Sequence, residues 1–504
     1  EDIEMQKWKG RIVLAGNLIK TATGQWAVFA EIGSVPSTMA ACRLLLTAFC
    51  LVKDTMFLQS DCIRAYVQAT MKGPPTFIRL PKAWWPKSWA GKFKDPVCRL
   101  EKALYGHPHA GDFWYDRLEE ELKLLGFETV EGWPSVFLLY PSSEHTVAFV
   151  VYVDDLLMWG SSHLVEVIKK LRTKIEMEEP AALQKYLGCV HHISRKLVKG
   201  ETITSIEFDM TKYFDSAIEQ YLELAVDKLA KVASPYAPKV PTEELDELLA
   251  QEGRMAPHAA SLVMKLMYGV RMAAPHLSVA IGRLASQITK WTGESDRKLH
   301  RVYSYLKGAS NLTLKGYLST EDLSSVELVA WPDADLCGDF MSTKSTSGFF
   351  MEVRGMDGRG MPVSWGSKKQ GCTAQHTAEA EVVSMATCMR SELLPAQYLL
   401  QKLLRRAVGA KVMEDNNACI TSVEKGYSPS MRHLPRTQKI SIGMLHEVIQ
   451  KEATEINGKV DVIKAKSEEH LGDVMTKELE VCKFEKAVEM LRISELGKFI
   501  DVEE

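Results

Sequence analysis

Two adjacent aspartates, Asp154 and Asp155, stand between two apolar runs in the segment TVAFVVYVDDLLMWG. Such runs on either side of a short polar centre predict a β-hairpin with the acids at its tip. Paired carboxylates in an apolar hairpin are costly unless a cation lies beside them. Asp61, at the end of the strand-like segment FLQSD, supplies a third carboxylate. A bare Asp-Asp pair more often caps a turn, but these flanking runs are too apolar for an exposed turn, so we predict a two-metal site.

A second set of acids lies in the last third of the chain. Asp333 ends a strand-like segment, Glu381 lies in the first turns of a helix predicted over 377–404, Asp415 ends the strand-like VMED, and Asp473 begins a predicted helix, DVMTKEL. Strand ends and helix starts can converge, and helix N-termini favour anionic side chains. Taken singly, Asp473 is more often an N-cap and Glu381 an ordinary helical residue.

The elements that would position these acids follow from the hydrophobic periodicity. Residues 1–200 alternate short β-rich runs with helical patterns, and an amphipathic helix is predicted over 109–127. The stretch 201–258 has the composition of a loop-rich connection, and 261–310 is helical. The last third has the β-meander, helix, strand, helix order of a small α/β domain.

Length and composition fit an ordinary globular protein. The chain has 504 residues, 46% of them hydrophobic, and a formal net charge of −3. This length suits about three domains. No stretch approaches the roughly 18 apolar residues of a membrane helix, and no secretory signal is seen, so we expect an intracellular protein. The ten cysteines lack metal-ligand spacing and are expected to be reduced.

One tract departs from this near-neutral balance. Residues 261–317 contain nine Lys or Arg against two acids. A surface that follows a nucleic-acid backbone would have this charge, and so would a solvated helix face. Charge alone leaves the two interpretations open.

The motifs around both acid sets resemble those of copia-type LTR retrotransposon Pol polyproteins. In the first half the similar blocks are KGRIVLAGN, the segment from RLLLTAFC to FIRLP, CRLEKALYGHPHAGDFWYDRLEEELKLLGF and YLGCVHHISRK. They match, in order, the fingers motif, the palm strand, the LYG block and the block closing the palm of the reverse transcriptase. The later blocks PDADLCGD, KSTSGF, WGSKKQ, TAEAE, EDNNACI and LGDVMTKEL are similar, in order, to the family's RNase H domain.

The resemblance implies a multidomain α+β and α/β fold. A right-hand polymerase with palm and fingers is expected over 1–200, a thumb or connection-like segment over 201–322, an RNase H-like α/β domain over 323–480 and a tail over 481–504. The family's fingers begin upstream of Glu1, so that subdomain is expected to be truncated at its N-terminus.

The resemblance also assigns roles in the polymerase half. Asp61, Asp154 and Asp155 would hold two Mg²⁺ ions, with Mn²⁺ as the alternative, and would be catalytic. Lys9 and Arg11 would meet the incoming triphosphate. Tyr66 would be an aromatic gate under the sugar. His109 stands where the family usually has Gln beside the nucleotide, a departure that introduces a titratable ring. These four residues are the predicted substrate-binding set: Lys9, Arg11, Tyr66 and His109.

In the RNase H half the resemblance gives four catalytic, metal-binding acids: Asp333, Glu381, Asp415 and Asp473. They too would hold two Mg²⁺ ions. Two nearby acids compete for these assignments. We prefer Glu381 to Glu379, because the following EVVS spacing matches the family's glutamate, and we prefer Asp333 to its neighbour Asp335.

The function expected from the resemblance is an RNA-directed DNA polymerase with ribonuclease H activity, acting in a cytoplasmic particle or the nucleus. Its partners would be an RNA template, a DNA primer, an RNA–DNA hybrid, deoxynucleoside triphosphates and other parts of the Pol polyprotein, with no membrane. The alternatives are a decayed, inactive retrotransposon copy and a non-enzymatic nucleic-acid-binding scaffold. Intact acids argue against both alternatives, whereas His109 and the shortened fingers favour decay.

Overall fold

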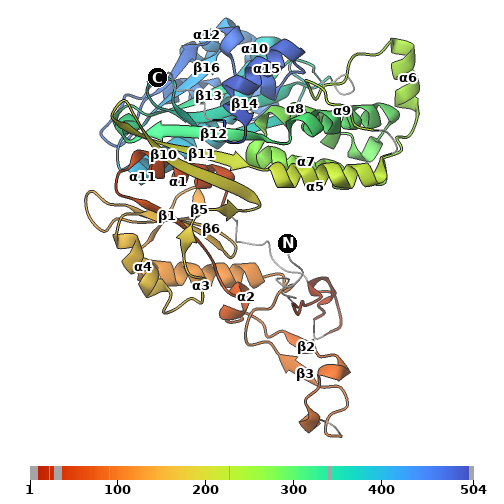
Figure 1. The fold of residues 1–504 in the computed structure, drawn as a ribbon, viewed down its shortest axis with the longest axis vertical. Helices are drawn as coiled ribbons and strands as arrows, with labels where there is room; N and C mark the ends of the chain where they lie inside the picture. The colour runs from red at the N-terminus through yellow and green to blue at the C-terminus, as the bar shows by residue number, and fades with distance from the viewer. Residues whose placement is uncertain are drawn as a thin grey trace. The chain divides into compact units, whose positions relative to one another are not determined.

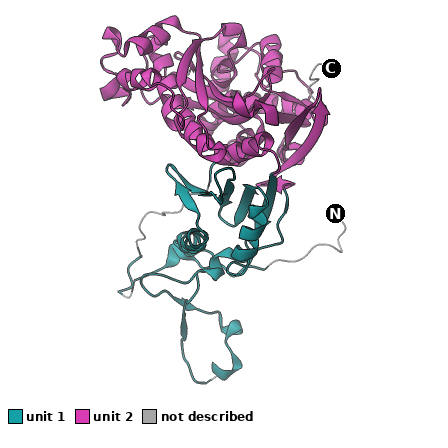
Figure 2. Ribbon diagram, turned by 90° about the vertical axis from the view of Figure 1, so that its left-hand side faces the viewer, with its two compact units in different colours: residues 1–38, 55–182 teal, residues 39–54, 183–504 magenta. Residues whose placement is uncertain are grey.

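The computed structural model describes residues 10–21, 23–27, 37–89, 91–225, 228–338 and 343–498 (Figure 1). They form two compact units (Figure 2). The first comprises Glu1–Thr38 and Thr55–Ala182, and the second comprises Met39–Asp54 and Leu183–Glu504. The boundary between the two units therefore falls after Ala182, whereas the sequence predicted a domain boundary at residue 200.

Unit 1 contains a six-stranded sheet with the order β4-β5-β6-β7-β1-β8, in which all neighbouring strands are antiparallel. The predicted hairpin is present as β6 and β7. Both strands are buried almost throughout, which explains their uninterrupted apolar sequence. The strands are β1 (Met56–Asp61), β4 (Glu128–Val130), β5 (Trp133–Leu139), β6 (Val147–Tyr152), β7 (Asp155–Gly160) and β8 (Ala181–Ala182).

Helices α3 (Ala110–Leu124) and α4 (His163–Leu171) contribute to the core of this sheet. The predicted amphipathic helix is confirmed by α3, whose Trp114, Leu118 and Leu122 are fully buried. The chain also forms a short helix and a small separate two-stranded sheet, which are α2 (Ala65–Gln68), β2 (Phe77–Arg79) and β3 (Val97–Arg99).

Unit 2 is built on a ten-stranded sheet with the order β17-β16-β13-β14-β15-β12-β11-β10-β9, and β18 pairs with β12. The meander of β13, β14 and β15 is antiparallel, whereas β16 and β17 run parallel to β13 and β16 respectively. The strands are β9 (Lys185–Tyr186), β10 (Cys189–Val198), β11 (Glu201–Asp209), β12 (Leu312–Ser319), β13 (Glu327–Asp335), β14 (Thr346–Arg354), β15 (Gly360–Lys369), β16 (Gly409–Glu414), β17 (Val460–Lys464) and β18 (Ile493–Glu495).

The stretch predicted as a loop-rich connection is more regular than expected. Residues 201–258 contain β11 and two helices, α5 (Thr211–Leu224) and α6 (Thr242–Ala250). Strand β11 pairs with both β10 and β12, so it joins the same sheet as the last third of the chain. The loop prediction was wrong because polar residues separate the apolar residues of β11 in the sequence. Three of those apolar residues, Ile203, Ile206 and Phe208, are buried.

The remaining helices surround this sheet. The helix predicted over 377–404 is present as α10 (Thr377–Cys388), a single wider π turn over Met389–Leu393, and α11 (Leu394–Leu404). The helix predicted to begin at Asp473 is only a 3₁₀ turn over Asp473–Met475. The others are α1 (Met39–Leu51), α7 (Ala259–Ala273), α8 (Ser278–Ala285), α9 (Gly293–Ala309), α12 (Asn417–Lys425), α13 (Leu434–Thr437), α14 (Ile442–Gln450) and α15 (Val481–Met490).

Helix α1 belongs to unit 2 although the rest of its sequence neighbourhood belongs to unit 1. Its residues from Ala40 to Leu51 are all buried, and it packs on α11 and β15. The buried Arg43 guanidinium donates to the carbonyl oxygens of Val363, Arg271 and Met272 at 2.8–3.0 Å. These bonds satisfy a charge that burial would otherwise make costly.

The basic tract is largely engaged inside unit 2. Lys315 and Glu207 form a buried ion pair at 3.0 Å, and the Arg301 guanidinium donates to the Ser234 carbonyl at 2.9 Å. Seven of the nine Lys and Arg side chains in residues 261–317 form a hydrogen bond or an ion pair within the described part of the chain: Lys265, Arg283, Arg297, Lys298, Arg301, Lys307 and Lys315. The tract therefore holds the unit together more than it forms a free surface. None of the described helices is long and apolar enough to cross a membrane.

Candidate active sites

The first site lies at the end of the unit 1 sheet where β1, β6 and β7 meet. The antiparallel register of β1 and β7 sets Asp61 opposite Asp155. Asp154 lies in the turn between β6 and β7, and the Cys62 amide donates to its carbonyl oxygen at 2.8 Å. The fold thus brings Asp61, which lies more than 90 residues away in the sequence, to the end of the sheet that carries the adjacent Asp154 and Asp155.

The hairpin tip is held in a strained conformation. Val153 has a φ of +61°, in the left-handed region that β-branched residues rarely adopt. The indole Nε1 of Trp114, on α3, donates to the Val153 carbonyl at 2.7 Å. Strain of this kind persists only where the surroundings impose it, so Trp114 fixes the turn that carries Asp154.

The three carboxylates at this end of the sheet raise the pKa values of neighbouring groups. Burial, followed by Asp154 and Asp61, raises the pKa of Asp155 to about 6. Burial and the same three carboxylates raise the pKa of the Cys62 thiol. Carboxylate oxygens are the ligands that Mg²⁺ prefers, and a divalent cation would offset this charge, so the donor set fits such an ion.

A pair of tyrosine rings, Tyr66 and Tyr105, lies beside the acids. The Tyr66 ring, on α2, lies 4.9 Å from the Tyr105 ring, and the Arg11 guanidinium lies 5.5 Å from the centre of Tyr105. Burial and the carboxylate of Asp154 raise the pKa of Tyr66. Tyr105 was missed from the sequence, although it is the tyrosine of the LYG block. Lys9, the other predicted phosphate ligand, lies outside the described residues.

Two glycines permit the N-terminal segment to approach the LYG block. The Leu14 amide donates to the Tyr105 carbonyl at 2.7 Å. Gly106 has a φ of +87°, and a Cβ there would lie 2.1 Å from the Leu14 carbonyl oxygen. A Cβ on Gly16 would lie 1.9 Å from the Gly106 carbonyl oxygen. Only glycine fits such an approach.

This approach leaves a cavity of about 1390 Å³ whose lining includes Arg11, His109 and Phe113. His109 precedes helix α3, and its Nδ1 lies 2.8 Å from Asp112 Oδ2. Two of the predicted substrate-binding residues thus border one cavity in unit 1.

The second site lies in unit 2 and is more tightly gathered. Ligand atoms of Asp333, Glu381 and Asp415 all lie within 4.8 Å of one another. Asp333 is on β13 and Asp415 directly follows β16. Because β13 and β16 are parallel, their carboxyl ends meet at the same edge of the sheet.

Helix α10 brings Glu381 to this edge. One turn later, Ser384 Oγ donates to the carbonyl oxygens of Asp333 at 2.7 Å and Gly348 at 3.2 Å, which fixes the helix face that carries Glu381. Glu381 is 4% exposed, and its Oε2 has no hydrogen-bond partner within the described ranges. Burial, then Asp333 and Glu414, raises its pKa. An orphaned buried carboxylate beside two more acids fits a bound divalent cation.

The competing acids have other partners. Glu379 accepts from the Gln375 amide at 3.0 Å, and its Oε1 lies 2.9 Å from His433 Nε2. Asp335 lies 3.5 Å from the Arg283 guanidinium. The gathered acids are thus Asp333 and Glu381 rather than these two neighbours.

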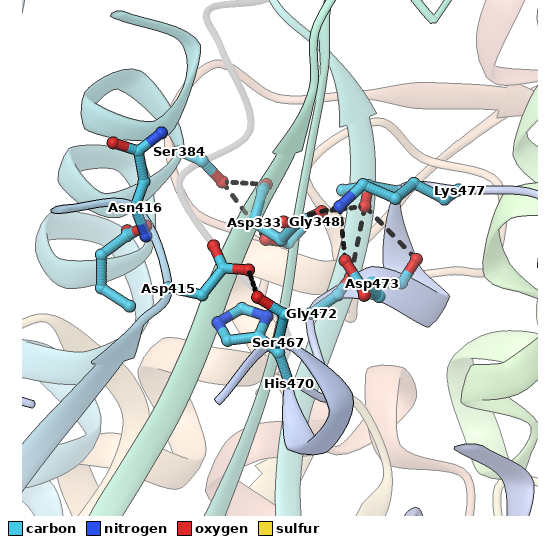
Figure 3. A network of polar contacts seen from close by, with 12 residues as sticks. Asp333, Gly348, Ser384, Asp415, Asn416, Ser467, His470, Gly472, Asp473 and Lys477 are labelled. Carbon is cyan, nitrogen blue, oxygen red and sulfur yellow. Dashed lines mark hydrogen bonds and ion pairs between the residues drawn. The ribbon is translucent and has the colours of Figure 1, made fainter. Parts of the chain in front are cut away.

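Asp473, the fourth predicted acid, lies on the opposite side of Asp333 together with a cation (Figure 3). The Lys477 ammonium forms ion pairs with Asp473 and, at 3.2 Å, with Asp333 Oδ1. Burial opposes its charge, but the two carboxylates raise the pKa of Lys477. His470 also lies within 4.8 Å of both acids. Neither Lys477 nor His470 was predicted from the sequence, since nothing in the spacing marks a lysine or histidine that the fold brings to an acid.

Comparisons with known proteins agree with the first-half motifs. Residues 1–220 match the family described as reverse transcriptase (RNA-dependent DNA polymerase). The chain is 24% identical over 499 residues to the retrovirus-related Pol polyprotein from transposon TNT 1-94 of Nicotiana tabacum, covering 97% of this chain and 34% of that protein. It is 26% identical over 435 residues to the polyprotein from transposon RE1 of Arabidopsis thaliana, covering 84% and 26%. The chain thus spans about a third or less of these relatives.

Among solved structures, the prototype foamy virus protease-reverse transcriptase is similar over 91% of this chain and 50% of that chain. The sequence identity is 13% and the TM-score is 0.20, too low to establish a common arrangement.

Proposed function

Because the chain belongs to the copia-type retrotransposon Pol polyproteins, we propose that it is an RNA-directed DNA polymerase that also degrades the RNA strand of an RNA–DNA hybrid. Its substrates are an RNA template, a DNA primer and deoxynucleoside triphosphates, followed by the hybrid that results. Other parts of the Pol polyprotein are its natural partners.

The observation that carries the polymerase proposal is the register pairing of Asp61 with Asp155 beside Asp154. These three residues would hold two divalent cations, with Mg²⁺ preferred and Mn²⁺ as the alternative. When bound, such ions activate the primer 3′-hydroxyl and neutralise charge on the phosphates. Trp114 keeps the Asp154 turn in the conformation that this requires, through its bond to Val153.

The incoming nucleotide is proposed to lie between the acids and the cavity of unit 1. Arg11 would meet the triphosphate, since a guanidinium can pair with two phosphate oxygens. Tyr66, whose ring lies tilted against that of Tyr105, would contact the sugar and exclude a 2′-hydroxyl. His109 would donate a hydrogen bond to the nucleotide, with its ring oriented by Asp112. Lys9 keeps its predicted role at the phosphates as part of this proposal.

The ribonuclease H proposal rests on the convergence of Asp333, Glu381 and Asp415, with Asp473 beside them. These acids would hold divalent cations whose chemistry is in-line attack of water on the RNA phosphodiester. Ser384 positions Glu381 by fixing α10 on β13. A bound cation would offset the burial of Glu381 Oε2, which has no hydrogen-bond partner among the described residues.

A non-enzymatic scaffold is a weaker account of the same residues. Burying Glu381 Oε2 without a hydrogen bond from any described residue destabilises the fold, and a protein that only binds nucleic acid has no use for such a group. The same cost argues against a decayed copy, in which a neutral replacement would relieve it.

The direct test is primer extension. The purified chain is incubated with a labelled DNA primer on an RNA template, Mg²⁺ and deoxynucleoside triphosphates, and the RNA is labelled separately to follow cleavage. We expect both primer elongation and shortening of the paired RNA. Failure of both, by a folded protein with Mg²⁺ or Mn²⁺, would refute the proposed function.

A further inference from the structure

His470 is a buried histidine at the second site that the predicted acid set does not include. It follows the 3₁₀ turn Ser467–Glu469 and is 5% exposed. Its Nε2 lies 2.9 Å from the Met413 carbonyl oxygen. Because a carbonyl can only accept, Nε2 carries a proton, which leaves Nδ1 as the ring nitrogen that can bind a metal ion.

The His470 ring lies beside two carboxylates. His470 Nδ1 is buried and has no hydrogen-bond partner within the described part of the chain. One ligand atom each from His470, Asp333 and Asp473 lie within 4.8 Å of one another. Two carboxylates and an imidazole nitrogen this close together make a donor set that can hold a cation, and in this structure the Lys477 ammonium supplies the positive charge.

The local backbone is shaped to permit this approach. A Cβ on Gly472 would lie 2.6 Å from the Asp333 Cβ and 2.7 Å from the His470 Cε1. Any larger residue would therefore push the turn that carries His470 and Asp473 away from strand β13. Figure 3 shows His470, Gly472 and Asp473 on this turn beside Asp333.

We propose that His470 Nδ1, Asp333 and Asp473 form a mixed nitrogen and oxygen position for a divalent transition-metal ion. This inference deepens the proposed ribonuclease H function and rests on it. The all-carboxylate position formed by Asp333, Glu381 and Asp415 suits Mg²⁺. An imidazole ligand instead favours Mn²⁺ over Mg²⁺, because Mg²⁺ prefers oxygen donors. The bond from Nε2 to Met413 is the kind of second contact that orients a metal-bound histidine.

Lys477 competes with the ion for this position. Its ammonium pairs with both Asp333 and Asp473, the two acids that the ion needs. Binding of a divalent cation therefore requires Lys477 to leave these carboxylates. The position is thereby weakened relative to one without a lysine, and removal of Lys477 strengthens it.

The test is pulsed electron paramagnetic resonance of Mn²⁺ bound to the full chain. Asp154→Asn protein is used, so that occupancy of the unit 1 acids is reduced, and Mn²⁺ is added in steps to saturation. We expect coupling of Mn²⁺ to a directly bound imidazole nitrogen. The coupling should change from ¹⁴N to ¹⁵N when histidine is ¹⁵N-labelled, and it should disappear in His470→Gln.

The matched control is His258→Gln, at an exposed histidine of the same unit, which should keep the coupling. Absence of imidazole coupling at saturating Mn²⁺ would overturn the proposal, as would coupling that survives in His470→Gln. The first result would mean that the ring is protonated and pairs with the acids, and the second that another histidine binds the ion.

Metal selectivity gives a second readout that does not depend on the variant's activity. His470→Gln should weaken Mn²⁺ binding by roughly ten- to a hundredfold, with a smaller effect on Mg²⁺. Lys477→Met should tighten Mn²⁺ binding several-fold. Equal losses for both ions in His470→Gln would contradict the nitrogen ligand. Imidazole coupling without any hybrid cleavage would remove the ribonuclease proposal and leave the metal position standing. Hybrid cleavage without imidazole coupling would overturn the proposed metal position and leave the ribonuclease proposal standing.

Discussion

Asp61 and Asp155 are register partners across the antiparallel strands β1 and β7, and the Cys62 amide ties the end of β1 to the turn that holds Asp154. The pairing depends on β1 entering the sheet beside β7 rather than on any sequence proximity. It supplies the geometric basis of the proposed polymerase site.

The turn that carries Asp154 should depend on Trp114. Trp114→Phe keeps most of the apolar volume but removes the hydrogen bond to the Val153 carbonyl, a loss of about 1 kcal/mol. Because the strained Val153 conformation is then less well held, primer extension should fall while hybrid cleavage by unit 2 stays near wild type. Trp133→Phe, in the same sheet, is the control. Equal extension by Trp114→Phe and wild type would show that the turn needs no such support.

The choice of nucleotide sugar should depend on Tyr66. Tyr66→Val removes the ring that packs against Tyr105, so ribonucleotide incorporation should rise relative to deoxynucleotide incorporation. Single-nucleotide extension kinetics with matched ribo- and deoxynucleotides measure the ratio. Tyr427→Val, at an exposed tyrosine of unit 2, is the control. An unchanged ratio in Tyr66→Val would make Tyr66 a packing residue.

The two glutamates of α10 should behave differently. Glu381→Gln removes a carboxylate of the gathered acids, so hybrid cleavage should fall by roughly a hundredfold or more. Glu379→Gln keeps a side chain that can bond to His433 and should retain most of the cleavage. Cleavage of labelled RNA in a preformed hybrid measures both. Greater loss in Glu379→Gln would mean that the helix presents the other glutamate to substrate.

Stability at mildly acidic pH should depend on His276. Burial lowers the pKa of His276 to about 3, and its ring packs against Tyr305 and Phe484. Between the ordinary histidine pKa near 6.5 and this value, the unfolded chain binds a proton that the folded chain does not. Stability therefore falls as pH decreases through this window, by up to about 1.4 kcal/mol per pH unit from this group.

His276→Phe should remove that contribution, so its thermal midpoint should fall less than that of wild type between pH 7 and pH 4.5. His258→Phe, at an exposed position, serves as the control and should follow wild type. Parallel midpoint curves for His276→Phe and wild type would show that the ring is charged or solvated in the folded protein.

Local patterns predicted the elements that carry the sites better than their assembly. The β6–β7 hairpin and helix α3 follow from runs and periodicity within a few residues, and both were predicted. The membership of α1 in unit 2, and of β11 in the large sheet, depends on packing against residues far along the chain. The same holds for Lys477 and His470, which reach Asp333 because the turn at Gly472 lies close against β13. The helix predicted to begin at Asp473 is a single 3₁₀ turn, and the role of Asp473 stays a prediction.

We propose that the two acid sets serve two separate reactions. Primer extension and RNA cleavage should therefore be followed together in wild type, Asp154→Asn and Glu381→Gln. We predict that Asp154→Asn abolishes extension and leaves cleavage of a preformed hybrid nearly intact, and that Glu381→Gln does the opposite. Extension at the wild-type rate by Asp154→Asn, or loss of both reactions in either variant while the protein stays folded, would contradict the account.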